Sequence, residues 1–88
     1  MGRIQEGLVM RMVAGEAVVI GVGAQAQLGA MIRLNRTGQA VWDGLARGLS
    51  DDEIAAQLVE AFDIDAVQAR ADVAAFVRQA AEEGLLAS

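Results

Sequence analysis

Hydrophobic residues follow two different patterns along the 88-residue chain. In the first third they form short apolar runs: LVMRMV at 8–13, AVVIGV at 17–22 and AMIRL at 30–34. The β-branched residues of the second run and the period-two alternation of the third are typical of strands. A turn signal, AGE at 14–16, and a glycine-flanked segment at 23–29 leave only short connections. We therefore expect an antiparallel meander.

After the third run the hydrophobic period becomes that of a helix. Trp42 and Leu45 lie one turn apart and belong to one apolar stripe. Asn35 or Thr37 is expected to cap this helix, because either side chain can accept a hydrogen bond from the exposed N–H groups of a first turn. Gly48 is expected to end the helix.

Two further helices are predicted together with their caps. The motif SDDE, which begins at Ser50, is a capping box in which Ser50 and Glu53 each satisfy a backbone N–H group. Asp65 is expected to cap the last helix, with Gln68 in the box position. Gly84 is expected to end that helix in the left-handed conformation.

These elements predict an α+β fold that is winged-helix-like. A three-stranded antiparallel β-sheet at about residues 8–34 is followed by three α-helices at about residues 36–84. We expect a single domain over residues 1–88, because a chain of this length is enough for one domain and not for two.

Composition narrows the range of functions. Much of the 55% hydrophobic content is alanine, so the three aromatic residues are expected to anchor a modest core: Trp42, Phe62 and Phe76. The net charge is −5, and all seven basic residues are scattered arginines, which argues against the positive face of a nucleic-acid-binding protein. Histidine and cysteine are absent, which argues against transition-metal sites and most general-base catalysis. We expect no catalytic residues, no metal and no cofactor.

Nothing in the sequence points to a membrane or to export. No apolar run approaches the length of a membrane span. The N-terminal segment MGRIQEG lacks the apolar core of a signal peptide. We therefore expect a cytoplasmic protein that contacts no membrane.

Two stretches of the chain resemble a known family. They are RLNRTGQAVWDGL at 33–45 and ADVAAFV…GLL at 71–86. The family is the PqqD-like family, named after pyrroloquinoline-quinone biosynthesis protein D. Its members include the recognition elements for ribosomally synthesised and post-translationally modified peptides. The resemblance covers roughly residues 8–86, and its most specific parts are core and cap residues: Leu34-Asn35, Thr37-Gly38, and Trp42 with Leu45.

The resemblance implies a non-catalytic peptide chaperone. In such domains the leader segment of a precursor peptide lies antiparallel along the third strand, in a groove between that strand and the third helix. The domain presents the leader to a modifying enzyme, such as a radical enzyme or a leader peptidase. Carried over to this chain, the strand residues are Ala30, Met31, Ile32, Arg33 and Leu34. The corresponding helix residues are Arg70, Ala74, Val77, Arg78 and Ala81.

An open strand edge is physically suited to this role, because it offers unpaired N–H and C=O groups to an extended chain. Arg70 and Arg78 lie two turns apart on the expected helix side, where we expect them to meet acidic leader residues. Many relatives have an aromatic residue in the third strand, whereas this chain has AMIRLN, so its leader preference is expected to differ. We expect a monomer or a weak homodimer.

A winged-helix transcription regulator is the strongest alternative, because its fold plan is similar. Its recognition helix would lie at 50–62, a segment with three acidic residues after Ser50 and no basic residue. Such a helix would repel DNA phosphates. A different protein-interaction module is a further alternative that the sequence leaves open. An enzyme lacks support, because no nucleophile–base pair is visible.

Overall fold

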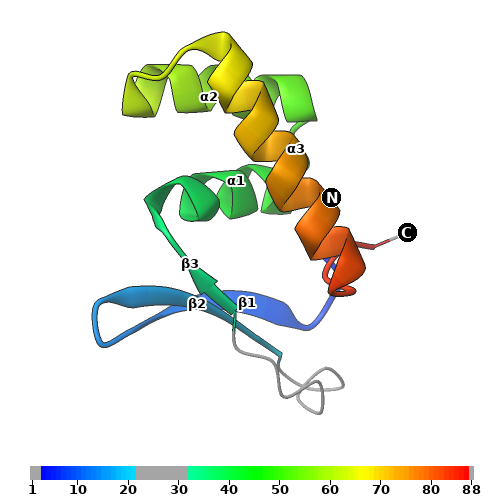
Figure 1. Ribbon diagram of the computed structural model, residues 1–88. Helices are drawn as coiled ribbons and strands as arrows, with labels where there is room; N and C mark the ends of the chain where they lie inside the picture. The colour runs from blue at the N-terminus through cyan, green and yellow to red at the C-terminus, as the bar shows by residue number, and fades with distance from the viewer. Residues whose placement is uncertain (1–2, 22–31, 88) are drawn as a thin grey trace.

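The computed structural model describes residues 3–21 and 32–87. Within these ranges the elements are β1 (Leu8–Val13), β2 (Glu16–Gly21), β3 (Ile32–Leu34), α1 (Arg36–Ala46), α2 (Asp51–Phe62) and α3 (Ala66–Glu82). Their order and type confirm the predicted α+β fold with three antiparallel strands followed by three helices (Figure 1). The predicted connection at 23–29 and two residues of the third predicted strand, Ala30 and Met31, lie outside the described residues.

The sheet has the strand order β1-β2-β3, so β2 is central and β3 lies at an edge. β1 and β2 are joined by the two-residue turn Ala14-Gly15, whose φ angles of 52° and 83° are both positive. Turns of this kind match the twist of the flanking strands. Glu16, the last residue of the AGE turn signal, already belongs to β2. β3 pairs antiparallel with β2 and places Leu34 opposite Ala17.

The first two helices begin at the predicted caps. The Asn35 side chain accepts a hydrogen bond from the Gly38 N–H at 2.7 Å, so Asn35 rather than Thr37 caps α1. Ser50 and Glu53 form the complete capping box at the start of α2. The hydrogen bond that the Ser50 N–H donates to the Glu53 carboxylate, together with the hydrogen bond of the Ser50 side chain, holds the pKa of Glu53 below its usual value.

The last helix follows the prediction at both ends, with one difference. The Asp65 side chain accepts a hydrogen bond from the Gln68 N–H at 2.7 Å and so caps α3. The Gln68 side chain does not complete a box but donates to Asp72 at 2.7 Å. Gly84 follows the helix with a φ of 76°, which confirms the predicted left-handed end.

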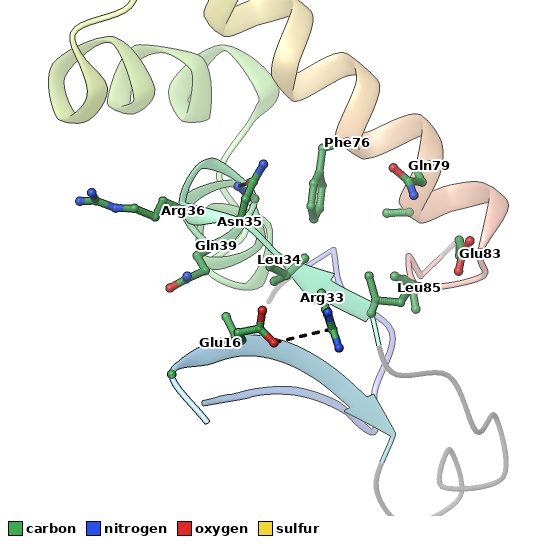
Figure 2. A pocket seen from close by; sticks show the side chains of 15 residues that line it. Glu16, Arg33, Leu34, Asn35, Arg36, Gln39, Phe76, Gln79, Glu83 and Leu85 are labelled. Carbon is green, nitrogen blue, oxygen red and sulfur yellow. Dashed lines mark hydrogen bonds and ion pairs between the residues drawn. The ribbon is translucent and has the colours of Figure 1, made fainter. Parts of the chain in front are cut away.

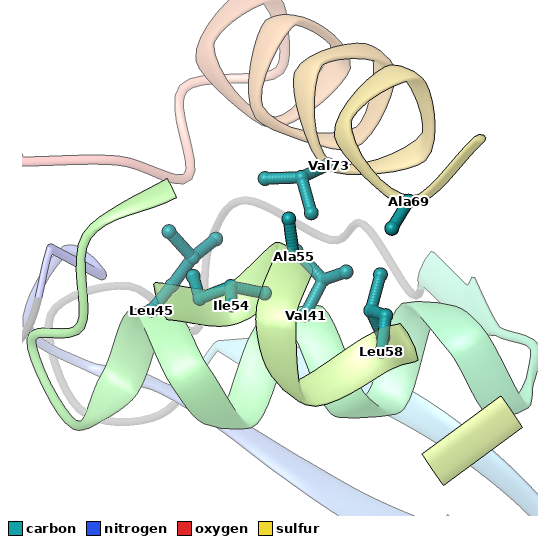
Figure 3. Packing of buried hydrophobic residues seen from close by; sticks show 7 residues of the cluster. All are labelled: Val41, Leu45, Ile54, Ala55, Leu58, Ala69 and Val73. Carbon is teal, nitrogen blue, oxygen red and sulfur yellow. The ribbon is translucent and has the colours of Figure 1, made fainter. Parts of the chain in front are cut away.

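α1 lies between the sheet and α2, and α3 runs past α1 toward the sheet (Figure 1). Two hydrophobic clusters fill the spaces on either side of α1. The helical cluster joins the three helices and consists of Val41, Leu45, Ile54, Ala55, Leu58, Ala69 and Val73 (Figure 3). The sheet cluster joins the sheet to α1 and the end of α3 and consists of Ala17, Val19, Leu34, Trp42, Ala80 and Leu85.

The three aromatic residues differ in their burial. Trp42 is only 4% exposed and belongs to the sheet cluster, as predicted for a core anchor. Phe62 is half-buried and packs against the helical cluster. Phe76 is also half-buried, but it packs against both clusters, so its ring stands where the two spaces meet.

The two ends of the described chain are paired beside the end of α3. Ile4 forms a bridge with Leu86, and the Gln5 N–H donates a hydrogen bond to the Leu85 C=O at 2.9 Å. This short pairing fastens the segment that follows α3 to the segment that precedes β1. It thereby holds Leu85 against the sheet cluster.

Replacing Trp42 with alanine tests the sheet cluster. Loss of so large a buried ring is expected to lower the free energy of unfolding by about 3–5 kcal/mol, most of the roughly 5 kcal/mol expected of so small a domain. Trp42→Ala should therefore be largely unfolded by circular dichroism and thermal melting. Val67→Ala is the matched control, because Val67 is 80% exposed and its truncation should leave the melting temperature almost unchanged. Cooperative melting of Trp42→Ala near the wild-type temperature would contradict the packing.

Candidate functional site

A groove of about 640 Å³ opens between β3 and the C-terminal half of α3 (Figure 2). Its walls come from the start of β2, from β3, from the first turn of α1 and from α3 with the segment that follows it. The apolar residues that line it are Ala17, Ile32, Leu34, Phe76, Ala80 and Leu85. Four of these six belong to the sheet cluster, so the floor of the groove is the open side of the core.

The absence of a side chain at Gly38 of α1 makes room for the ring of Phe76 in this groove. Gly38 faces the ring, and a Cβ atom at Gly38 would lie 3.4 Å from Phe76 Cε2 and 3.1 Å from Asn35 Oδ1. The second distance is tighter than an ordinary van der Waals contact. Glycine at this position therefore leaves room both for the cap of α1 and for the aromatic wall of the groove.

Polar and charged side chains form the rim of the groove. They are Glu16, Arg33, Asn35, Arg36, Gln39, Gln79 and Glu83. Arg33 Nε lies 3.7 Å from Glu16 Oε2, and their side chains are 77% and 57% exposed. Such a solvent-exposed ion pair contributes less than about 1 kcal/mol to stability, so a ligand can displace it at little cost.

The pairing of β1 with β2 fixes which backbone groups of β2 face β3. Val13 and Glu16 flank the two-residue turn as a pair, and such a flanking pair exchanges both of its backbone hydrogen bonds. The direction of the N–H and C=O groups alternates along a strand. Because Glu16 bonds toward β1, Ala17 and Val19 bond toward β3.

The same alternation determines the free groups of β3. Leu34 lies opposite Ala17 and Ile32 opposite Val19, so Leu34 and Ile32 bond to β2. The N–H and C=O of Arg33 therefore point to the other side of β3. No strand among the described residues pairs with that side, which leaves both groups at an open edge.

The predicted strand residues lie at the groove wherever the structure describes them. Ile32, Arg33 and Leu34 all line it. Ala30 and Met31, the other two predicted strand residues, belong to the part of the chain that is not described.

The structure differs from the prediction on the helix side, where none of the five expected residues lines the groove. Val77 is half-buried against the helical cluster, and the other four are exposed: Arg70, Ala74, Arg78 and Ala81. The helix wall is made instead by Phe76, Gln79, Ala80 and Glu83. Contact of Arg70 and Arg78 with acidic leader residues therefore stays a prediction that the lining of this groove does not support.

The rotation of α3 explains this difference. Ala69 and Val73 pack in the helical cluster, and Ala80 continues the same buried stripe into the sheet cluster. Between Val73 and Ala80, Phe76 is only half-buried, and it lines the groove. The sequence predicts Phe76 as a core anchor but carries no signal that part of its ring would be open to the groove.

Other kinds of site find no support in the described part of the chain. No group of three or more His, Cys, Asp or Glu side chains within residues 3–21 and 32–87 is placed to hold a metal ion. None of the helices in those ranges is long and apolar enough to cross a membrane.

A family model describes the greater part of the chain. The model for coenzyme PQQ synthesis protein D (PqqD) matches residues 10–86. The chain belongs to the PqqD family. This confirms the resemblance seen in the sequence, and the match extends from β1 to the segment that follows α3. Among curated proteins, none matches the chain significantly.

Solved structures share the fold of this PqqD-family chain. One is TbiB1 in complex with the TbiA(beta) leader peptide, which is 24% identical with a TM-score of 0.79, over 98% of this chain and 94% of that chain. Another is a lasso peptide synthetase B1 complexed with the leader peptide, which is 21% identical with a TM-score of 0.81, over 98% of this chain and 96% of that chain. At these identities the likeness establishes the fold.

Replacing Asn35 with alanine tests the junction that positions the groove. The change removes the acceptor for the Gly38 N–H and is expected to lower the free energy of unfolding by about 0.5–2 kcal/mol. Asn35→Asp keeps a side-chain acceptor and is the matched control. Urea unfolding followed by the fluorescence of Trp42, which is the one tryptophan in the sequence, measures both variants. Equal midpoints for wild type and Asn35→Ala would show that the cap does not support the junction.

Proposed function

We propose that this chain binds the leader segment of a ribosomally made precursor peptide and presents it to a modifying enzyme. The leader adds to the open edge of β3 and fills the groove beside α3. The observation that carries this proposal is the combination of an unpaired strand edge with an apolar groove alongside it. Two proteins with the same fold are complexes with leader peptides, which supports the proposal.

Strand addition accounts for affinity without a catalytic group. The N–H and C=O of Arg33 are available for two backbone hydrogen bonds, and each bond contributes a net of roughly 0.5–1.5 kcal/mol. Alternate side chains of an added strand point toward one face, where Leu34 and Phe76 offer an apolar surface. A buried aliphatic side chain contributes roughly 1.5–3 kcal/mol, from which the cost of ordering the peptide is subtracted. The result is a reversible complex, as presentation to an enzyme requires.

The groove also supports the non-catalytic part of the proposal. Its ionisable lining residues are two glutamates and two arginines: Glu16, Glu83, Arg33 and Arg36. Glu16 is paired with Arg33, and none of the four has a nucleophile beside it among the lining residues. The chemistry therefore belongs to a partner enzyme that acts on the precursor, such as a radical enzyme or a leader peptidase. Because precursor peptides are made on ribosomes, we place the complex in the cytoplasm.

The alternative of a transcription regulator gains no support. Its recognition helix would be α2, which has Asp51, Asp52 and Glu53 in its first turn and no basic residue in its sequence. A helix of this composition repels the phosphates of DNA.

Proline at position 33 tests strand addition directly. It removes an N–H that points to the open edge, while the bonds of Ile32 and Leu34 to β2 stay intact, and proline is tolerated on edge strands. Leader candidates are synthetic N-terminal segments of the short peptides encoded beside this gene, screened by calorimetry. For the leader that binds, Arg33→Pro should weaken binding by about tenfold or more. Arg33→Ala is the matched control, because it loses only the weak ion pair with Glu16 and should bind almost as the wild type does.

Amide chemical-shift mapping locates the bound leader. The expected shifts lie on β3, the start of α1 and the last turns of α3. Shifts that cluster on α2 while β3 stays unchanged would contradict strand addition, even if the chain binds the peptide.

A further inference from the structure

The two helix ends that border the groove carry charges of the unfavourable sign. A helix start is partially positive and a helix end partially negative, so acidic residues stabilise the start and basic residues the end. The first turn of α1 contains no acidic residue and begins instead with Arg36. The last turn of α3 contains no basic residue, and Glu82 and Glu83 stand at its end.

The start of α2 shows that this chain uses the favourable arrangement elsewhere. Asp51, Asp52 and Glu53 fill the first turn of α2, which does not border the groove. The end of α2 has Glu60 in its last turn, Asp63 at its cap and no basic residue in that turn, although it does not border the groove. The unfavourable sign therefore does not by itself mark the groove; Arg36 and Glu83 differ in that both line it.

These two charges lie at opposite ends of the groove (Figure 2). Arg36 stands where β3 passes into α1, and Glu83 lies beyond the other end of β3, near Leu85. Neither has a salt-bridge partner within the described ranges, whereas Arg33 and Glu16 in the middle of the groove neutralise each other at 3.7 Å. The groove therefore has a positive end and a negative end with an electrically balanced centre.

We infer that the groove selects a leader by the order of its charges, with acidic residues before the docked strand and basic residues after it. This inference rests on the proposed function. Both described strand pairs of the sheet are antiparallel, and a leader that continues this pattern on β3 has its N-terminal side next to Leu34 and Arg36 and its C-terminal side next to Glu83. Its acidic residues then lie near the start of α1 and its basic residues near the end of α3. Each charge has the sign that the dipole of that helix end favours.

One acidic side chain lies close to the positive end. Asp72 lines a smaller hollow of about 240 Å³ that shares Asn35 and Phe76 with the groove, but it does not line the groove itself. Its carboxylate accepts a hydrogen bond from the Gln68 side chain at 2.7 Å. The Asp72 carboxylate keeps its charge, but Arg36 is the charged side chain that lines the groove where β3 passes into α1.

Two synthetic decapeptides with acetylated and amidated ends test the inference. EETVTLSVKK has the favoured order of charges, and KKTVTLSVEE has the same core with the order reversed. Both are uncharged overall, so the net charge of −5 on the chain attracts neither. Amide shifts should place EETVTLSVKK in the groove with an affinity about 3- to 10-fold tighter, as expected of two partly exposed ion pairs. The difference should shrink between about 20 mM and about 500 mM salt, because the charges become screened.

A double charge reversal provides the decisive variant. Arg36→Glu with Glu83→Arg leaves the net charge at −5 and should invert the preference, so that KKTVTLSVEE binds more tightly. The matched control is Arg11→Glu with Glu60→Arg, which also conserves net charge but alters exposed residues outside the groove. The control should keep the wild-type preference.

A melting experiment without peptide tests the premise independently. Arg36→Glu and Glu83→Arg should each raise the melting temperature, because each gives a helix end the charge that its dipole favours. A lower melting temperature for both would overturn the premise that these charges are held against local stability.

The binding outcomes separate this inference from the proposed function. Equal affinities of the two decapeptides in the groove would overturn charge selection and leave strand addition standing. A preference that the Arg36 and Glu83 reversal does not invert would also overturn it. Shifts outside the groove would overturn strand addition and the inference together. Failure of both decapeptides to bind at millimolar concentration would overturn the charge contribution, while the Arg33→Pro experiment would still decide strand addition.

Discussion

The groove depends on the junction at which β3 passes into α1 with a single residue between them. Leu34 is buried in the sheet cluster, and Asn35 both continues the extended chain and caps the helix through the Gly38 N–H at 2.7 Å. This leaves no loop to absorb a change of angle, so the direction of α1 follows from the direction of β3. Gly38 then lets Phe76 approach the same junction. One short segment thus sets both walls of the groove.

The close packing of the helices positions α3 relative to this junction. A Cβ atom at Gly44 of α1 would lie 2.6 Å from Ile54 Cγ1 of α2, so the absence of a side chain allows these helices to pack closely. α3 packs against both and extends beyond the helical cluster toward the sheet (Figure 1). Its end is held by Leu85 in the sheet cluster and by the pairing of Ile4 with Leu86. The groove is the space that remains between this overhanging helix and the edge of the sheet.

An open strand edge is a hazard for a folded chain, because any extended segment can pair with it. The structure limits this hazard with a feature that also serves recognition. Arg33, which bears the outward-facing backbone groups of β3, has a charged and exposed side chain. A peptide whose side chains also fill the apolar floor of the groove gains hydrophobic contacts. A chance pairing with the strand edge alone does not provide these contacts.

The elements and their ends could be predicted from the sequence, because they depend on local chemistry. The caps Asn35, Ser50 and Asp65 act within one turn, and the hydrophobic period identifies each strand and helix without reference to the rest of the chain. The tertiary structure alone decided which face of α3 lines the groove. Sequence periodicity predicts that Phe76 packs in the core, but not that part of its ring is left open to the groove. The outward bonds of β3 likewise follow only from the strand register, which is a contact between distant parts of the chain.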